Sequence, residues 1–334
     1  MPKTTSTTSK PSNKKTSQAD TKETTPKKSM IAPNESVKIT LEWSSVEPVY
    51  QKTLKHFAKD VKAEGFRVGK APAAIVEAKV GFEKIADHVL QELLPAAYEA
   101  AASKAPKKPI THPEFNPIAL DKGKNWQLEA FFSIMPEVKL GDYKKIVKAA
   151  QKTAALFIKN RNQEIAKEAE AHAKGEHKHE DGHDHAHTHE PLGEQEIKEI
   201  KLQHIFKGLV DAFAPSIGEL MLRQETQSEY ERLLTQLKQY QITIEDYMAR
   251  RQIDIEQLSQ ELAGTVLSRL QLDFIMAAIS QAEKLEVSEA EVKDEVDKVT
   301  NLKMRQDLEK NQNYLNQIKA NLLQKKTLDL LLAL

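Results

Sequence analysis

The chain has 334 residues, no cysteine, and 49 basic side chains against 49 acidic ones. Disulfide scaffolds, thiolate metal sites and cysteine nucleophiles are therefore excluded. Glycine, at 11 residues, is about half as frequent as its usual share of roughly 7%, which favours helices over turn-rich sandwiches and barrels. The length predicts about two domains.

The net charge of zero conceals a gradient along the chain. Residues 1–148 carry 25 basic against 17 acidic side chains, and residues 149–334 carry 24 against 32. A basic part and an acidic part in one chain suggest partners of different character. No segment has the roughly 18 consecutive apolar residues that span a bilayer, so we expect a soluble protein without membrane contact.

Residues 1–33 form a polar tract that contains 13 serine or threonine residues and seven lysines. Its few apolar side chains cannot repay the entropy of folding, so we predict a disordered basic tail. The tract lacks the apolar core of a secretory signal. Its lysines are expected to attract a polyanion.

Residues 34–148 have the pattern of an α+β domain. Apolar and polar residues alternate over residues 37–43 and again over residues 126–132, which predicts two half-buried strands. Four prolines between residues 106 and 117 mark a turn-rich segment ahead of the second strand.

Three helices are predicted in the same domain. The first begins at about Glu47, with Pro48 tolerated in its first turn. The second covers residues 72–80, and the third is a long amphipathic helix over residues 82–103. Pro95 is expected to kink or split this third helix.

Residues 149–196 are predicted to form a charged helix, up to about residue 172, and then a histidine-rich linker. Residues 197–334 have the pattern of an all-α domain. We expect its longest helix over residues 255–284 and its last helix over residues 313–334. The residues predicted to cap helices, each with an acidic residue three positions on, are Ser216, Thr243 and Ser288.

The first two predicted helices are separated by a loop of sequence Gly65-Phe66-Arg67-Val68-Gly69-Lys70. An exposed phenylalanine ring is unfavourably hydrated unless another surface covers it. Arg67 and Lys70 on either side of Phe66 suit a phosphate-rich surface. The alternative is that Phe66 packs against its own domain.

Seven of the 11 histidines lie between residues 172 and 189. Neutral imidazoles that alternate with acidic side chains suit zinc, nickel or copper, and a flexible chain can wrap the ion. We expect weak zinc or nickel binding that is lost below about pH 6.5, where the imidazoles become protonated. The alternative is a plain solvated linker. The candidate metal ligands are His177, His179, His183, His185, His187 and His189.

The loop and the helices on either side of it resemble the N-terminal domain of the bacterial trigger factor family of ribosome-associated chaperones. The motif that carries the resemblance is Gly65-Phe66-Arg67-Val68-Gly69-Lys70-Ala71-Pro72. The segment Phe131–Leu140 is similar to the closing strand of that domain and its Pro-Glu-Val exit. Segments between Leu209 and Leu331 are similar to the helical chaperone domain of the family.

This resemblance implies docking on the large ribosomal subunit near the polypeptide exit tunnel. It assigns the contact to Gly65, Phe66, Arg67, Gly69 and Lys70. Val68 stands where the family usually has another basic residue, and Lys70 and the basic tail can compensate. The resemblance further implies a cytoplasmic, ATP-independent chaperone that requires no cofactor, assists the folding of nascent or unfolded polypeptides, and can form a homodimer away from the ribosome.

A peptidyl-prolyl isomerase domain normally lies between the two parts in this family. Residues 149–196 contain a single aromatic residue, Phe157, and cannot form a β-sheet domain with an aromatic pocket. We therefore expect no catalytic residues and no isomerase activity. The alternative function class is a metal-binding or general peptide-binding protein that acts through the histidine-rich linker.

Overall fold

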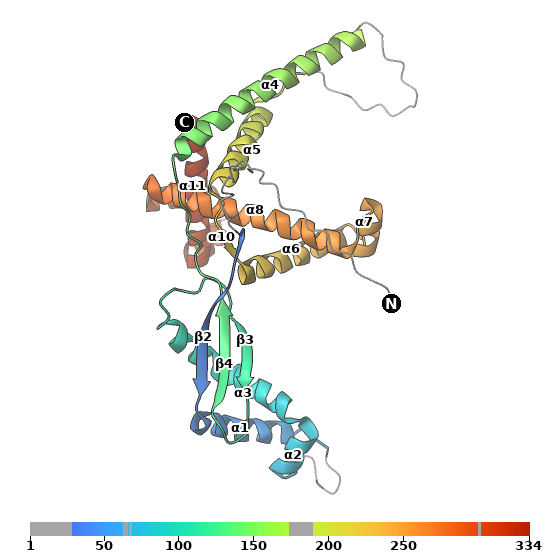
Figure 1. Cartoon of the computed structure of the whole chain (residues 1–334), viewed down its shortest axis with the longest axis vertical. Coiled ribbons are helices and arrows are strands. Elements are labelled where there is room, and N and C mark those ends of the chain that lie inside the picture. The colour runs from blue at the N-terminus through green and yellow to red at the C-terminus, as the bar shows by residue number, and fades with distance from the viewer. Residues whose placement is uncertain (1–28, 63–65, 67–68, 174–189, 300–301) are drawn as a thin grey trace, which may run out of the picture.

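The computed structural model describes residues 29–62, 66, 69–173, 190–299 and 302–334. A three-stranded sheet and its helices form one end of an elongated molecule, and a helical body forms the other (Figure 1). The elements of the sheet region are β2 (Glu35–Leu41), α1 (Trp43–Ala58), α2 (Ala73–Val80), α3 (Phe82–Ala102), β3 (Glu114–Ala119) and β4 (Trp126–Phe132). The elements of the helical body are α4 (Tyr143–Ala173), α5 (Glu194–Phe213), α6 (Glu219–Gln239), α7 (Ile244–Arg251), α8 (Ile255–Ala282), α9 (Glu289–Asp297), α10 (Leu302–Glu309) and α11 (Gln312–Ala333). Two short parallel strands, β1 (Ile31–Ala32) and β5 (Ile217–Gly218), connect the two parts. β1 lies within residues 1–33, so the predicted disordered tail is wrong there, because pairing with β5 orders this segment; residues 1–28 lie outside the described residues.

The sheet is antiparallel, in the order β2-β4-β3. The alternation seen in the sequence places one face of β2 and β4 in the core, where Ile39, Trp126 and Leu128 are almost fully buried. Tyr50 of α1 and Val89 of α3 pack into the same core. The two predicted strands are therefore confirmed, as are the helices at α2 and α3 and the predicted fold class.

The first helix begins earlier than the sequence predicted. Trp43 is the first residue of α1 and not the last residue of the strand, because Asn125 Oδ1 accepts a hydrogen bond from the Trp43 amide at 2.9 Å. Pro48 consequently lies inside the helix and not in its first turn. α3 continues through Pro95 without a break, so the helix is not split there.

The proline-rich return contains a strand, which the sequence did not predict. β3 carries Pro117 and pairs with β4 at the edge of the sheet, with a shift of register between Pro117 and Ala119. An edge strand tolerates proline because one side of the strand needs no hydrogen-bond donor.

The helical body has its own core, to which α4, α5, α8 and α11 contribute. Tyr143 and Val147 of α4 are buried there with Ile205, Ile279 and Leu331, so this core draws residues from both sides of position 148. α8, at 28 residues, is the longest helix described within residues 197–334, as predicted, and α4, at 31 residues, which precedes that segment, is longer still.

α8 is also the one helix, in the part of the chain that the structure describes, that is long and apolar enough to cross a membrane by length and composition. Its neighbours account for its apolar character, because α5, α6 and α11 all contact it. Arg269 of α8 pairs with Glu225 of α6 at 2.9 Å, so an ion pair lies at the contact between these two helices.

Two of the three predicted helix caps are confirmed. Thr243 accepts a hydrogen bond from the amide of Asp246, and Ser288 forms a capping box with Glu291. The third is wrong, because Ser216 precedes β5 and donates its hydroxyl to the carbonyl of Ser29 at 2.5 Å.

The N-terminus of α6 is capped from outside the helical body. The N-cap residue, Gly218, has no side chain to offer. Asn34 Oδ1 accepts from the amide of Leu220 at 2.8 Å, and Ser133 Oγ accepts from the amide of Met221 at 3.1 Å. These contacts fix the direction in which α6 leaves the sheet region, because they satisfy donors that every helix leaves free at its first turn.

Candidate functional site

The loop between α1 and α2 lies at the end of the molecule farthest from the helical body (Figure 1). Phe66 in this loop is 43% exposed. Gly69 has φ +86° and donates its amide to the carbonyl of Ala58 at 3.1 Å, which closes the loop onto the last turn of α1. Only glycine adopts such a positive φ without strain, so this position explains the second glycine of the motif.

Three of the five residues predicted to dock are described, and all three lie at this tip. Phe66, Gly69 and Lys70 belong to one short connection, and the side chains of Phe66 and Lys70 are exposed. Gly65 and Arg67 lie outside the described residues.

The structure adds basic residues that sequence reasoning did not assign to the site. Lys55 and Lys59 occupy successive turns at the C-terminal end of α1 and are exposed, as is Lys62 just beyond the helix. The four-residue spacing of Lys55 and Lys59 was a readable signal, since residues so spaced share one helix face. Cations at the end of a helix also offset its dipole, so they stabilise the helix and add positive potential to the tip.

The base of the tip is held by an aromatic contact. The ring of Phe57 in α1 meets the imidazole of His88 in α3 edge-on, with centroids 4.8 Å apart. Lys84 Nζ lies 5.8 Å from the centre of the same ring. These contacts fix α1 and α3 against each other near the C-terminal end of α1, from which the loop leaves.

The predicted metal ligands lie outside the described residues. All of them fall between residues 174 and 189: His177, His179, His183, His185, His187 and His189. Within the described ranges, no group of three or more histidine, aspartate or glutamate residues is placed to hold a metal ion.

The helical body carries a groove between α6 and α8, with a volume of about 630 Å³. Its walls are largely apolar, with Leu222 and Tyr230 from α6 and Leu258 and Leu262 from α8, and Ile255 at its margin is exposed. A second hollow, of about 520 Å³, lies between α9 and α11. Open surfaces that combine apolar and polar side chains in this way are suited to binding apolar polypeptide segments weakly.

The ionisable groups of the helical body whose pKa values are shifted lie in contacts that hold its helices together. Burial raises the pKa of Tyr143, and the nearby Glu283 carboxylate raises it further. Lys144, at 2.8 Å, and the hydroxyl of Tyr143, which donates to Glu283 at 2.6 Å, both lower the pKa of Glu283. These contacts tie the start of α4 to the end of α8.

Comparison with known proteins identifies the family. The model of the bacterial trigger factor protein matches residues 23–168, and the model of the C-terminus of the same protein matches residues 191–333. The chain belongs to the trigger factor family. The two matches are separated by only 22 residues, 169–190, which include most of the histidine-rich tract.

Curated trigger factors match a shorter part of the chain. The trigger factor of Streptococcus suis (strain 05ZYH33) is 34% identical over 114 residues, which are 34% of this chain and 27% of that protein. The trigger factor of Lactobacillus gasseri is 36% identical over 120 residues, 36% of this chain and 26% of that protein. The matched segment thus spans about a quarter of these relatives.

A solved structure of the trigger factor chaperone, studied for promiscuous substrate recognition in folding and assembly, has the same fold. It aligns with a TM-score of 0.52 and 13% identity, covering 90% of this chain and 97% of that chain. This agreement supports a trigger factor fold for the sheet region and the helical body together.

Proposed function

We propose that this trigger factor is an ATP-independent molecular chaperone that docks on the large ribosomal subunit near the polypeptide exit tunnel. The observation that carries the proposal is the family match at both ends of the chain, combined with the exposure of Phe66 at the tip of the sheet region. It acts in the cytoplasm and requires no cofactor.

The docking step rests on two kinds of contact. Covering the Phe66 ring removes apolar surface from water, at about 25 cal/mol for each Å². The cations of the tip, Lys55, Lys59, Lys62 and Lys70, attract ribosomal RNA over a longer range. Docking raises the local concentration of the helical body around each emerging chain.

The helical body then holds nascent or unfolded polypeptides. The groove between α6 and α8 offers apolar walls to exposed segments and delays their aggregation. Several weak contacts permit release without nucleotide hydrolysis.

We also propose that the protein has no peptidyl-prolyl isomerase activity. The two family matches leave 22 residues between them, and α4 and α5, which flank this segment, pack side by side as a helical hairpin. Proline-limited refolding that the pure protein accelerates would contradict this.

Ribosome co-sedimentation tests the docking proposal. Phe66→Ala combined with Arg67→Ala is expected to remove most of the protein from the ribosomal pellet at moderate salt. Ile118→Ala, which shortens an exposed apolar residue on β3, is the matched control and should pellet as wild type does. Unchanged pelleting of the loop variant would show that the docking assignment is wrong.

Binding of zinc or nickel by the histidine-rich tract remains a separate proposal. Calorimetry at neutral pH should detect weak binding that disappears when residues 175–190 are deleted. The chaperone proposal requires the same deletion to leave suppression of aggregation intact, whereas a metal carrier would lose its activity. Absence of any heat with either metal would remove the metal proposal.

A further inference from the structure

β2 is an edge strand with a hollow running along it. It pairs with β4 on one side, and no other strand in the described part of the chain pairs with it. Residues 35–40 all line a cavity of about 550 Å³ between this strand and the C-terminal end of α3. Consecutive residues of a strand point to opposite faces, so a cavity lined by six in a row follows the backbone edge of β2.

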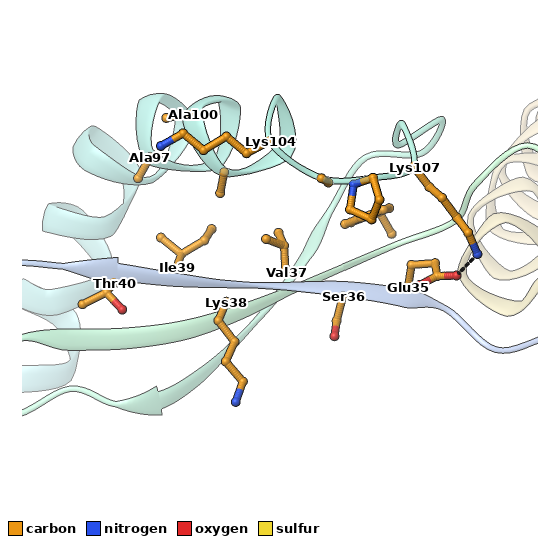
Figure 2. Close-up of a pocket in the computed structure, with 14 residues that line it drawn as sticks. Glu35, Ser36, Val37, Lys38, Ile39, Thr40, Ala97, Ala100, Lys104 and Lys107 are labelled. Atoms are coloured by element: carbon orange, nitrogen blue, oxygen red, sulfur yellow. Dashed lines mark hydrogen bonds and ion pairs between the residues drawn. The ribbon is translucent and has the colours of Figure 1, made fainter.

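Small residues on α3 leave this space open. Figure 2 shows Val37 and Ile39 directed toward α3, where Ala97 is directed back toward the strand, while Lys38 is directed to the opposite side; Ala100 also lines the cavity. A larger side chain at position 100 would occupy the cavity.

A second cavity, of about 850 Å³, continues the first toward the helical body. Glu35 and Lys107 line both cavities, so the two adjoin at the ion pair between these residues, and we call them together the β2 groove. Its far part is lined by Ile110, Ile134 and Met135, and the Met135 side chain is 63% exposed. Exposed methionine is a flexible apolar contact that adapts to different partners.

The rim of the β2 groove is basic. Its charged residues are five lysines, Lys38, Lys104, Lys107, Lys108 and Lys139, and two glutamates, Glu35 and Glu137. Lys107 pairs with Glu35 at 2.7 Å, and Lys139 lies 4.0 Å from Glu137. Lys104 and Lys108 make no ion pair with any residue that the structure describes, so the rim has cations to offer an acidic partner.

We propose that the β2 groove binds an extended segment of an unfolded polypeptide as an added strand. The backbone of such a segment pairs with the free edge of β2, which a folded surface or a helix cannot do. Alternate apolar side chains enter the space beside Val37 and Ala100, and acidic side chains meet Lys104 and Lys108. This inference rests on the proposed chaperone function and names the class of client segment that the sheet region takes.

Charge argues against a second copy of this chain in the groove. A symmetric contact between two β2 edges sets the same patch against itself, so that the basic rims of both copies come together. Like charges in that position are destabilising. An unfolded client with acidic side chains has the opposite charge and fits better.

Peptide binding to the full chain tests the proposal. The probe is a fluorescent ten-residue peptide with alternating leucines and two glutamates at one end, followed by anisotropy. Ala100→Trp is expected to weaken binding at least about tenfold, a loss of roughly 1.4 kcal/mol. Gln91→Trp adds the same ring to an exposed position on the opposite face of α3 and should bind as wild type does. Thermal melts establish that both variants are folded.

Two further comparisons test the backbone and charge parts separately. Methylating alternate amides on one edge of the peptide should abolish binding, and methylating the other edge should not. A peptide with lysines in place of its glutamates should bind the wild-type protein more weakly. The Lys104→Glu variant should bind this lysine peptide more tightly than the wild-type protein does.

Equal affinity of the wild-type, Ala100→Trp and Met135→Ser proteins would overturn the proposal. A wild-type dimer in sedimentation velocity that Ala100→Trp dissociates would overturn it as well, because a second copy would then occupy the groove. Failure of the chaperone function is distinguishable, since the wild-type protein would then neither pellet with ribosomes nor suppress aggregation. If it does both while the groove variants bind the peptide normally, only this inference fails.

Discussion

At the scale of single residues, the docking tip depends on one exposed ring and one backbone angle. Phe66 remains partly exposed because the loop closes through Gly69, whose positive φ turns the chain back to α1. The sequence predicted this ring as a contact residue. It did not identify Lys55 and Lys59. Their four-residue spacing indicates a shared helix face, but only the fold places that face beside the loop.

Glu291 makes stability depend on pH. Lys326 and Ser288 hold the pKa of this carboxyl at about 2, below its ordinary value of 4.5. A lowered pKa contributes stability that is complete above pH 4.5 and is lost as the pH falls toward 2. Glu291→Gln should therefore lower the melting temperature at pH 7 and flatten its decline between pH 5 and 2. Glu289→Gln, in the same turn of α9, is the control and should keep the wild-type profile.

Two glycines should respond to alanine in opposite directions. A Cβ on Gly218 would lie 2.4 Å from Ser133 Oγ and 2.6 Å from Ser133 Cβ, so Gly218→Ala is expected to be destabilising by about 1–3 kcal/mol. Gly264 lies inside α8 with open space around it, and Gly264→Ala should be stabilising by about 0.5–1 kcal/mol. Urea unfolding measures both, and a neutral Gly218→Ala would mean that this contact is not tight in solution.

At the scale of elements, the junction is built around the first turn of α6. Asn34 and Ser133, which flank the sheet in sequence, supply the cap that α6 lacks. Asn34 also donates to the carboxylate of Glu219 at 2.6 Å. The β1–β5 pairing lies next to these contacts, so strand and cap hold the helical body in one orientation.

Removing this cap should loosen the junction. Asn34→Ala leaves the amide of Leu220 without its acceptor and is expected to cost about 1 kcal/mol. Hydrogen exchange at Leu220 and Met221 should quicken, while exchange in β4 stays as it was. Asn116→Ala, at an exposed position of β3, is the control, and equal exchange in the two variants would contradict the role given to Asn34.

At the scale of the whole molecule, the proposed ribosome docking is assigned to the tip of the sheet region, and client holding is assigned to the helical body at the other end and to the β2 groove. The tip of the sheet region is basic, whereas residues 149–334 carry the acidic excess, which would disfavour contact of the helical body with RNA in the proposed docked state. Because of this separation, we expect that a substitution can reduce one activity and leave the other unchanged.

Substitutions in the groove between α6 and α8 test that independence. Tyr230→Ser with Ile255→Ser should reduce suppression of aggregation several-fold and leave ribosome co-sedimentation unchanged, because neither residue is near the tip. Tyr240→Ser, which removes an exposed ring outside the groove, is the control. A parallel loss of both activities would contradict the assignment to separate ends.

Local pattern determined much of this fold. Alternation over β2 and β4 and helical spacing in α3 and α11 were sufficient, because each of these elements buries one continuous face and repeats its pattern several times. Thr243 and Ser288 could be predicted as helix caps for a similar reason, because a cap and its partner lie three residues apart in the sequence. In the docking loop, the sequence identified Phe66, Gly69 and Lys70 through their spacing in one short motif.

The tertiary structure alone decided the elements that depend on distant partners. β3 is a strand because it pairs with β4, and β5 is a strand because it pairs with β1. A segment that contains proline and a strand of two residues both lack the repeated alternation from which a strand can be predicted. The cap of α6 is made by Asn34 and Ser133, which are remote from it in sequence. The β2 groove likewise exists only because the small residues Ala97 and Ala100 of α3 line a space beside an unpaired strand edge, and no spacing within either element encodes that approach.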